Sequence, residues 1–196
     1  MAVPDQSHID AAWTSYRLAK PEDGIAHARL AVAADASDGE SWYALACNLE
    51  RIGQLHEADR AFLHAERAPE RSIVAPFRVS WSRFQRSVKT ACDVLPPDLR
   101  NALAEITLVT ADYAEPYLLE AFDDPEVMGM FEGATRAESD NASGVISPRI
   151  HLWRRSHEHA CTSAKDFDNE VKQTLHHELG HYLGYDEEDL EQLGMD

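Results

Sequence analysis

The stretch His177-Glu178-Leu179-Gly180-His181 lies near the end of a chain of 196 residues. On an α-helix each residue turns by about 100°, so histidines four positions apart project from the same face, one turn from each other. Two imidazoles in that arrangement can hold one Zn²⁺, and the Glu178 carboxylate between them points near the same ion. The stretch therefore predicts a helix that carries two metal ligands and an acidic group.

The residues around this stretch favour a helix with one buried face. Apolar side chains recur at every fourth position and form a continuous stripe that would pack on a core. The stripe consists of Phe167, Val171, Leu175, Leu179 and Leu183. His177 and His181 fall roughly 200° and 240° away from Leu175, so we expect them to face a cleft or solvent. Gly184 follows as a natural helix stop, because glycine adopts the left-handed conformation readily.

The chain after Gly184 offers a third ligand. H-E-x-x-H is typical of zinc metallopeptidases, in which zinc acidifies a water and the glutamate deprotonates it to attack a peptide bond. When H-E-x-x-H-x-x-G is followed by a further ligand, the spacing places that ligand at position 187. Carboxylate oxygens bind zinc, so we predict Glu187 as the third ligand, with Asp186 as the alternative. Both carboxylates could instead cap a short last helix, whose N-terminus favours acidic side chains.

Four further stretches precede this helix in an order and spacing that are typical of one family. They are residues 95–100, 105–109, 130–133 and 148–155. With the H-E-x-x-H-x-x-G stretch, they make residues 77–194 resemble the minimal zincins, a family of small bacterial zinc metallopeptidases. The resemblance implies an α+β fold with a small mixed sheet and an active-site helix. It also implies that His177 and His181 bind zinc and that Glu178 is the catalytic base. The family often has aspartate as the third ligand, so Glu187 departs from its usual pattern.

Residues 7–70 show an internal repeat, with a weaker copy about 32 residues ahead of a clearer one. In the clearer copy, Trp42 and Leu45 stand on the expected first helix, and Phe62 stands on the second. Large residues at these positions, alternating with small ones that let the helices approach, resemble a tetratricopeptide repeat. We therefore predict an all-α module over 7–70, followed by the zincin-like domain over 77–196. The module would either dock a peptide or protein partner or brace the catalytic domain.

Composition excludes several classes of partner. Lys and Arg number 18 against 35 Asp and Glu, which gives a formal charge of −17. Such a chain repels the phosphates of nucleic acids and the surface of an anionic membrane. Three widely spaced cysteines do not form a disulfide framework and suit a reducing compartment. The first residues lack the basic and apolar regions of a signal peptide, and no stretch is apolar enough to span a bilayer. We expect a cytoplasmic protein.

The other segments of the second domain are predicted from residue type and spacing. A helix is expected over 77–93. Strands, marked by β-branched and alternating residues, are expected at 106–110, 128–131 and 145–153. We expect residues 157–161 to be a solvated connector rather than a second metal site.

Two functions compete. The favoured one is a cytoplasmic zinc-dependent peptidase that acts on a peptide or protein substrate. The alternative is a helical-repeat adaptor whose zincin-like domain is structural or catalytically silent. An open zinc position would favour the peptidase, whereas a closed site of four protein ligands would indicate a structural ion. Tyr182 and Tyr185 lie close enough in sequence to stabilise an oxyanion, although packing or exposure is the simpler role.

Overall fold

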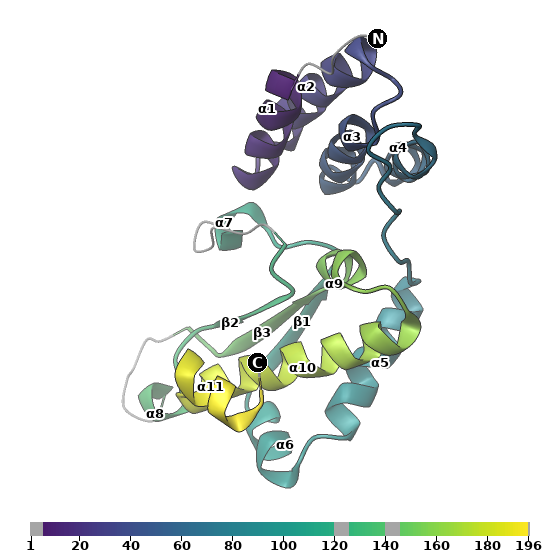
Figure 1. Cartoon of the computed structure of the whole chain (residues 1–196). Coiled ribbons are helices and arrows are strands. Elements are labelled where there is room, and N and C mark those ends of the chain that lie inside the picture. The colour runs from purple at the N-terminus through teal and green to yellow at the C-terminus, as the bar shows by residue number, and fades with distance from the viewer. Residues whose placement is uncertain (1–5, 120–125, 140–145, 196) are drawn as a thin grey trace. The chain divides into compact units, whose positions relative to one another are not determined.

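The computed structural model describes residues 6–119, 126–139 and 146–195 (Figure 1). Contacts between residues divide this part of the chain into two compact units. The first comprises residues 6–76 together with 115–119, and the second comprises 77–114 together with 126–195. The boundary after residue 76 coincides with Pro76, and proline restricts both itself and the residue before it.

The first unit is built from four helices, each of which packs against the next along the chain. They are α1 (Gln6–Arg17), α2 (Pro21–Ala34), α3 (Gly39–Arg51) and α4 (Leu55–Arg67). Ala28 and Ala44 are fully buried and let the helices approach closely, while Leu49 and Phe62 fill the space between them. The N-terminal region is therefore all-helical, as predicted. A short helix, α7 (Pro116–Leu119), groups with this unit.

The second unit contains a three-stranded mixed sheet with the strand order β1-β3-β2. The central strand β3 (Arg149–Trp153) runs parallel to β1 (Thr107–Ala111) and antiparallel to β2 (Gly129–Glu132). Ile150 and Leu152 of β3 are fully buried in the core. In this sheet, β1 and β2 are the two edge strands.

Helices cover the face of the sheet to which Ile150 and Leu152 point. The long helix α10 (Ala164–Leu183) packs against β2, β3, α5 (Trp81–Asp93) and α6 (Pro97–Leu103), and it crosses beneath the strands in Figure 1. Phe84 from α5 and Leu175 from α10 meet the two strand residues in one core. A small mixed sheet with helices packed on it confirms the predicted α+β class. The remaining described helices are α8 (Arg136–Ser139), α9 (Arg154–Ala160) and α11 (Glu187–Leu193).

The helix expected over 77–93 is shorter than predicted. It begins at Trp81, because the Ser80 side chain accepts a hydrogen bond from the Arg83 backbone N–H and caps the helix there. Helical spacing continues across residue 80, whereas the capping hydrogen bond requires extended backbone at that position. The capping serine therefore sets the start of the helix, which apolar spacing alone would place nearer the N-terminus.

The strands differ slightly from the predicted ranges. Those expected at 106–110 and 128–131 are present, each shifted by one residue. The strand expected over 145–153 begins at Arg149, and residue 145 lies outside the described residues. Pro148 has no N–H to pair within a sheet, so the regular ladder starts after it.

The prediction that residues 157–161 form a solvated connector is wrong. Most of them belong to α9, and His157 and Glu158 are fully buried. Arg78 and Arg155 each place a guanidinium nitrogen within 2.9 Å of the Glu158 carboxylate, which also accepts a hydrogen bond from the Val79 backbone N–H. Burying a carboxylate requires such partners, and two of the three come from a distant part of the chain.

Within the described residues, no helix has the length and apolar character needed to cross a membrane. All three cysteines lie in the described part of the chain, and none of them forms a disulfide. Burial raises the pKa of the Cys161 thiol to about 11 and also raises that of Cys92. These two thiols therefore stay protonated at neutral pH, and a protonated thiol is neither a nucleophile nor a metal ligand.

Candidate metal centre

The helix α10 holds the predicted ligands in a fixed frame. Ser163 caps its first turn by accepting a hydrogen bond from the Asp166 backbone N–H. The predicted apolar stripe is buried from Phe167 to Leu179, which pins one face of the helix to the core. The side chains of His177 and His181 lie on another face and remain about a quarter exposed. The helix ends at Gly184, which has the left-handed φ of 95°.

The segment after Gly184 folds back so that α11 packs against α10. Asp186 and Asp189 form a reciprocal capping box at the start of α11. Leu190 is fully buried and occupies the space next to Gly180, where a Cβ atom would lie only 2.2 Å from the Leu190 Cδ2 atom. The absence of a side chain at position 180 therefore sets how close the two helices come. This packing places Glu187, the first residue of α11, beside the two histidines.

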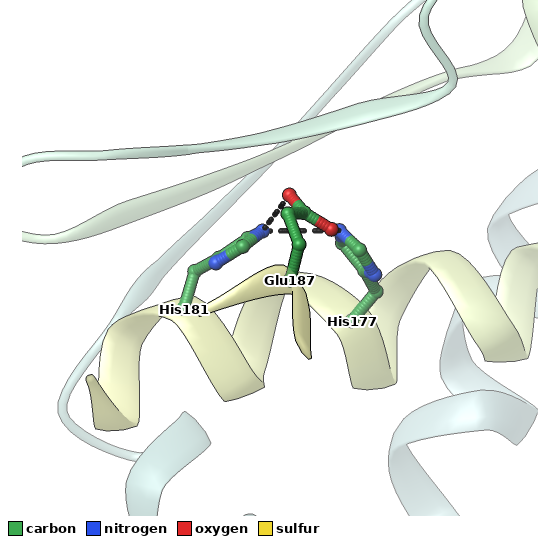
Figure 2. A group of neighbouring side chains, drawn as sticks. All are labelled: His177, His181 and Glu187. Carbon is green, nitrogen blue, oxygen red and sulfur yellow. Dashed lines mark hydrogen bonds and ion pairs between the residues drawn. The ribbon is translucent and has the colours of Figure 1, made fainter. Parts of the chain in front are cut away.

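His177, His181 and Glu187 converge above the surface of α10 (Figure 2). The Nε2 atoms of the two imidazoles are 3.0 Å apart. The Glu187 carboxylate straddles them, with Oε1 at 3.3 Å from His181 Nε2 and Oε2 at 3.7 Å from His177 Nε2. The structure thus brings together the two predicted histidines and the favoured third ligand.

The donor set fits Zn²⁺. Zinc binds imidazole nitrogen and carboxylate oxygen at about 2.0–2.2 Å, so in a tetrahedral site the ligand atoms lie about 3.3 Å from one another. The three distances above, 3.0, 3.3 and 3.7 Å, scatter around that value. His181 Nδ1–H donates to the Tyr185 carbonyl oxygen over 3.1 Å, which leaves the Nε2 lone pair free to bind a metal. Nitrogen and oxygen donors, mutual spacing and tautomer therefore all agree with a zinc site.

Glu178 lies on the same helix but in a different environment. Its side chain is largely buried, and the residue is 7 % exposed. Burial raises the pKa of the Glu178 carboxyl to about 7; the nearby charge of Glu187 adds to this, and a hydrogen bond from the Phe131 backbone N–H opposes it. A carboxyl group with a pKa near neutrality can both accept and donate a proton at physiological pH.

The edge strand β2 runs directly beside Glu178. The Trp153 backbone N–H donates to the Met128 carbonyl at the end of the antiparallel pair. Because paired groups alternate along an antiparallel ladder, the backbone groups of Gly129 and Phe131 point away from β3, toward the open edge. A Cβ atom at position 129 would lie 3.3 Å from Glu178 Oε1 and 2.5 Å from a methyl group of Thr174. Glycine at this position therefore allows the strand to approach the carboxylate.

Three other predicted residues have structural roles. The Asp186 side chain accepts the Asp189 backbone N–H as the cap of α11, so this alternative ligand is engaged elsewhere. The ring of Tyr182 is buried in the core, and its hydroxyl donates a hydrogen bond to Glu105 over 2.6 Å, so Tyr182 has a structural role. Tyr185 contributes its main-chain carbonyl to His181 rather than its phenol.

Sequence reasoning missed Gly129, Phe131 and Gly180 as parts of the site. A strand was predicted at 128–131, but the sequence of one strand does not show its register against β3 or its distance from α10. A glycine inside a helical pattern was the available signal for Gly180, since glycine there is unfavourable unless packing requires it.

Comparison with known families agrees with this geometry. Residues 103–195 match the model of a family described as zincin-like metallopeptidase. The matched stretch runs from the end of α6 to the end of the described chain and contains all three strands, α10 and α11. Among curated proteins, none matches the chain. The match shows that this part of the second unit is similar to that family.

Proposed function

We propose that the second unit is a zinc-dependent metallopeptidase. The convergence of His177, His181 and Glu187 beside the buried Glu178 carboxylate is the observation that carries this proposal. A family match to zincin-like metallopeptidases supports the same reaction class. Two imidazoles and one carboxylate, with an acid/base carboxyl next to them, form the protein part of a hydrolytic zinc site.

The number of ligands favours catalysis over a purely structural ion. Among the described residues, the cluster around the two histidines has three members, whereas structural zinc sites almost always have four protein ligands. His177 and His181 would hold Zn²⁺ through their Nε2 atoms, and Glu187 through its carboxylate. When bound, Zn²⁺ acidifies a water molecule and polarises a carbonyl oxygen. The fourth position is then available to water or substrate.

Glu178 supplies the proton transfers. Its carboxylate accepts a proton from the attacking water and later donates it to the departing amine. The Phe131 backbone N–H that hydrogen-bonds this carboxylate holds it at the boundary between α10 and β2. The burial of Glu178 keeps bulk water away from the group that must move the proton.

The substrate is a peptide bound in extended form along β2. This strand is an edge of the sheet, and besides the Phe131 N–H that Glu178 already accepts, it presents the Gly129 N–H and C=O and the Phe131 C=O outward. An extended peptide can add to such an edge through main-chain hydrogen bonds. That arrangement would bring a peptide bond to the carboxylate without requiring a specific side chain. We further propose that the helical first unit is a tetratricopeptide-like module that binds a peptide or protein partner separately from the metal centre.

Zinc content and hydrolysis together test the proposal. The purified parent should contain about one zinc per chain, and a His177→Ala/His181→Ala double variant should contain none. Glu178→Gln should retain zinc and lose hydrolysis of a peptide library, because the glutamine amide cannot accept the proton. A parent that binds no zinc even after reconstitution would exclude the peptidase. Equal cleavage by Glu178→Gln and the parent would exclude the assigned mechanism. Zinc without any cleavage would favour the silent adaptor.

A further inference from the structure

The methyl group of Thr174 is a spacer between α10 and the edge strand β2. Thr174 lies one turn before Glu178 on α10, so the two side chains share a helix face. A Cβ atom added at Gly129 would lie 2.5 Å from the Thr174 Cγ2 methyl carbon and 3.3 Å from Glu178 Oε1. Because a carbon–carbon bond is about 1.5 Å long, the Gly129 Cα itself lies within about 4.0 Å of the methyl carbon, which is van der Waals contact. The methyl group therefore limits how closely β2 approaches α10 beside the carboxylate.

The hydroxyl of the same side chain has two acceptors, which fix the direction of the methyl group. Thr174 Oγ1 donates to the Glu170 carbonyl oxygen over 2.9 Å and lies 3.1 Å from His157 Nε2. Burial lowers the pKa of His157 to about 4, so the ring is neutral at pH 7. Its Nδ1 carries the proton, because it lies 2.7 Å from the Trp153 carbonyl oxygen, which only accepts, and Nε2 is left as an acceptor. Threonine in a helix divides between two rotamers, and the contact with His157 selects the one that turns the methyl group toward Gly129.

The gap between β2 and α10 bears on the proposed reaction, because the strand would hold the peptide and the helix holds the base. The Phe131 backbone N–H donates a hydrogen bond to the Glu178 carboxylate, so the strand also orients that group. A misplacement of about 1 Å between reacting groups can lower a rate about 100-fold. A residue that sets this gap therefore acts on the reaction without touching the substrate.

We propose that Thr174 is a positioning residue of the peptidase, whose methyl group sets the distance between a peptide on β2 and the Glu178 carboxylate. This inference rests on the proposed function, which supplies the substrate. The two branches of the side chain have different roles. The methyl group sets the gap, and the hydroxyl, through its contact with His157, sets the direction of the methyl group. Thr174→Ser removes the methyl group and Thr174→Val removes the hydroxyl, so the two variants separate these roles.

Amide hydrogen exchange in the metal-free full chain tests the spacing independently of activity. Gly129→Ala should force β2 away from α10 by about 1 Å or more, because the new Cβ atom would otherwise lie 2.5 Å from the Thr174 methyl carbon. The Phe131 amide should then exchange at least about tenfold faster, while the Thr107 amide, which donates to the Pro148 carbonyl oxygen, keeps its parental rate. Adding Thr174→Ser removes the clashing methyl group and should restore most of the protection of Phe131. Parental exchange of Phe131 in Gly129→Ala, or no recovery in the double variant, would overturn the proposal.

Kinetics of the zinc-loaded full chain test the consequence for the reaction. With a peptide that the parent cleaves, Thr174→Ser should lower kcat about tenfold, with KM and zinc content close to those of the parent, because only the alignment is lost. Thr174→Val keeps a methyl-sized spacer but leaves His157 Nε2 without the hydroxyl, so it should lower kcat less and the thermal unfolding midpoint more. Thr90→Ser makes the first change at an exposed position of α5 and should leave kcat unchanged.

The outcomes distinguish this proposal from the proposed function. A parental kcat in Thr174→Ser would overturn the role of Thr174 while the peptidase stands. A parent that neither binds zinc nor cleaves peptides would exclude the peptidase, and the exchange rates of Phe131 would still decide whether Thr174 sets the gap between β2 and α10.

Discussion

Replacing Gly180 with alanine should weaken zinc binding without unfolding the protein. The added Cβ atom would lie 2.2 Å from Leu190 Cδ2, whereas carbon atoms in contact are about 3.5–4.0 Å apart. The Leu190 methyl group must therefore move by roughly 1.3 Å or more, and because Leu190 is fully buried with little room to change rotamer, we expect α11 to move with it. Glu187 stands on the first turn of that helix and moves with it, while His177 and His181 stay on α10.

The expected magnitudes distinguish a local effect from a global one. Overpacking of a buried contact typically costs about 1–3 kcal/mol, and alanine in a helix interior recovers about 0.5–1 kcal/mol relative to glycine. The free energy of unfolding should therefore fall by no more than about 2.5 kcal/mol. A metal ligand displaced by more than about 0.2 Å no longer matches its bond length. Mutation of residues that orient metal ligands typically lowers metal affinity about 10- to 100-fold, and we expect a similar loss of zinc affinity here.

Competition with a chromophoric chelator measures the affinity, and thermal unfolding followed by circular dichroism measures stability. Leu190→Val shortens the opposing side chain by one methylene, so the double variant Gly180→Ala/Leu190→Val should recover much of the lost zinc affinity. Leu190→Val alone serves as the control and should cost about 1 kcal/mol of stability with near-parental affinity. The reasoning is refuted if Gly180→Ala binds zinc as tightly as the parent, or if the double variant binds no better than Gly180→Ala.

Three further predictions concern pH, the cap of α11 and the buried tyrosine. Burial lowers the pKa of His157 from 6.5 to about 4, so the stability from its neutral form is complete above about pH 6.5 and is lost as pH falls toward 4. Between pH 6.5 and pH 4, denaturant titrations should show the free energy of unfolding of the parent falling by about 3 kcal/mol more than that of His157→Asn. Equal losses in the two proteins would contradict the assignment. Asp186→Ala removes a helix cap worth about 1 kcal/mol and should lower zinc affinity less than Glu187→Ala does; the reverse order in chelator competition would make Asp186 the ligand. Tyr182→Phe removes only the hydroxyl bonded to Glu105, so zinc content and peptide cleavage should persist, and loss of cleavage alone would restore the phenol as an oxyanion donor.

The features that sequence predicts well here depend on short-range geometry. Two histidines four residues apart share a helix face whatever surrounds them, because the helix repeat is fixed. The apolar stripe from Phe167 to Leu183 likewise identifies the buried side of α10. The α+β class was predicted from the family resemblance, and the local patterns agree with it, since β-branched and alternating segments stand beside segments of helical period.

Other features required the folded chain. Sequence spacing favours Glu187 as the third ligand but leaves Asp186 as an alternative, and only the packing of Leu190 against Gly180 turns Glu187 toward the histidines while Asp186 caps α11. The burial of Glu178 depends on β2, which approaches α10 across Gly129. The burial of Glu158 depends on Arg78. By itself, the sequence determined which residues can share a helix face, because that depends on spacing alone. The tertiary structure decided which of them face one another across elements, because those distances depend on how side chains from separate segments fill a common space.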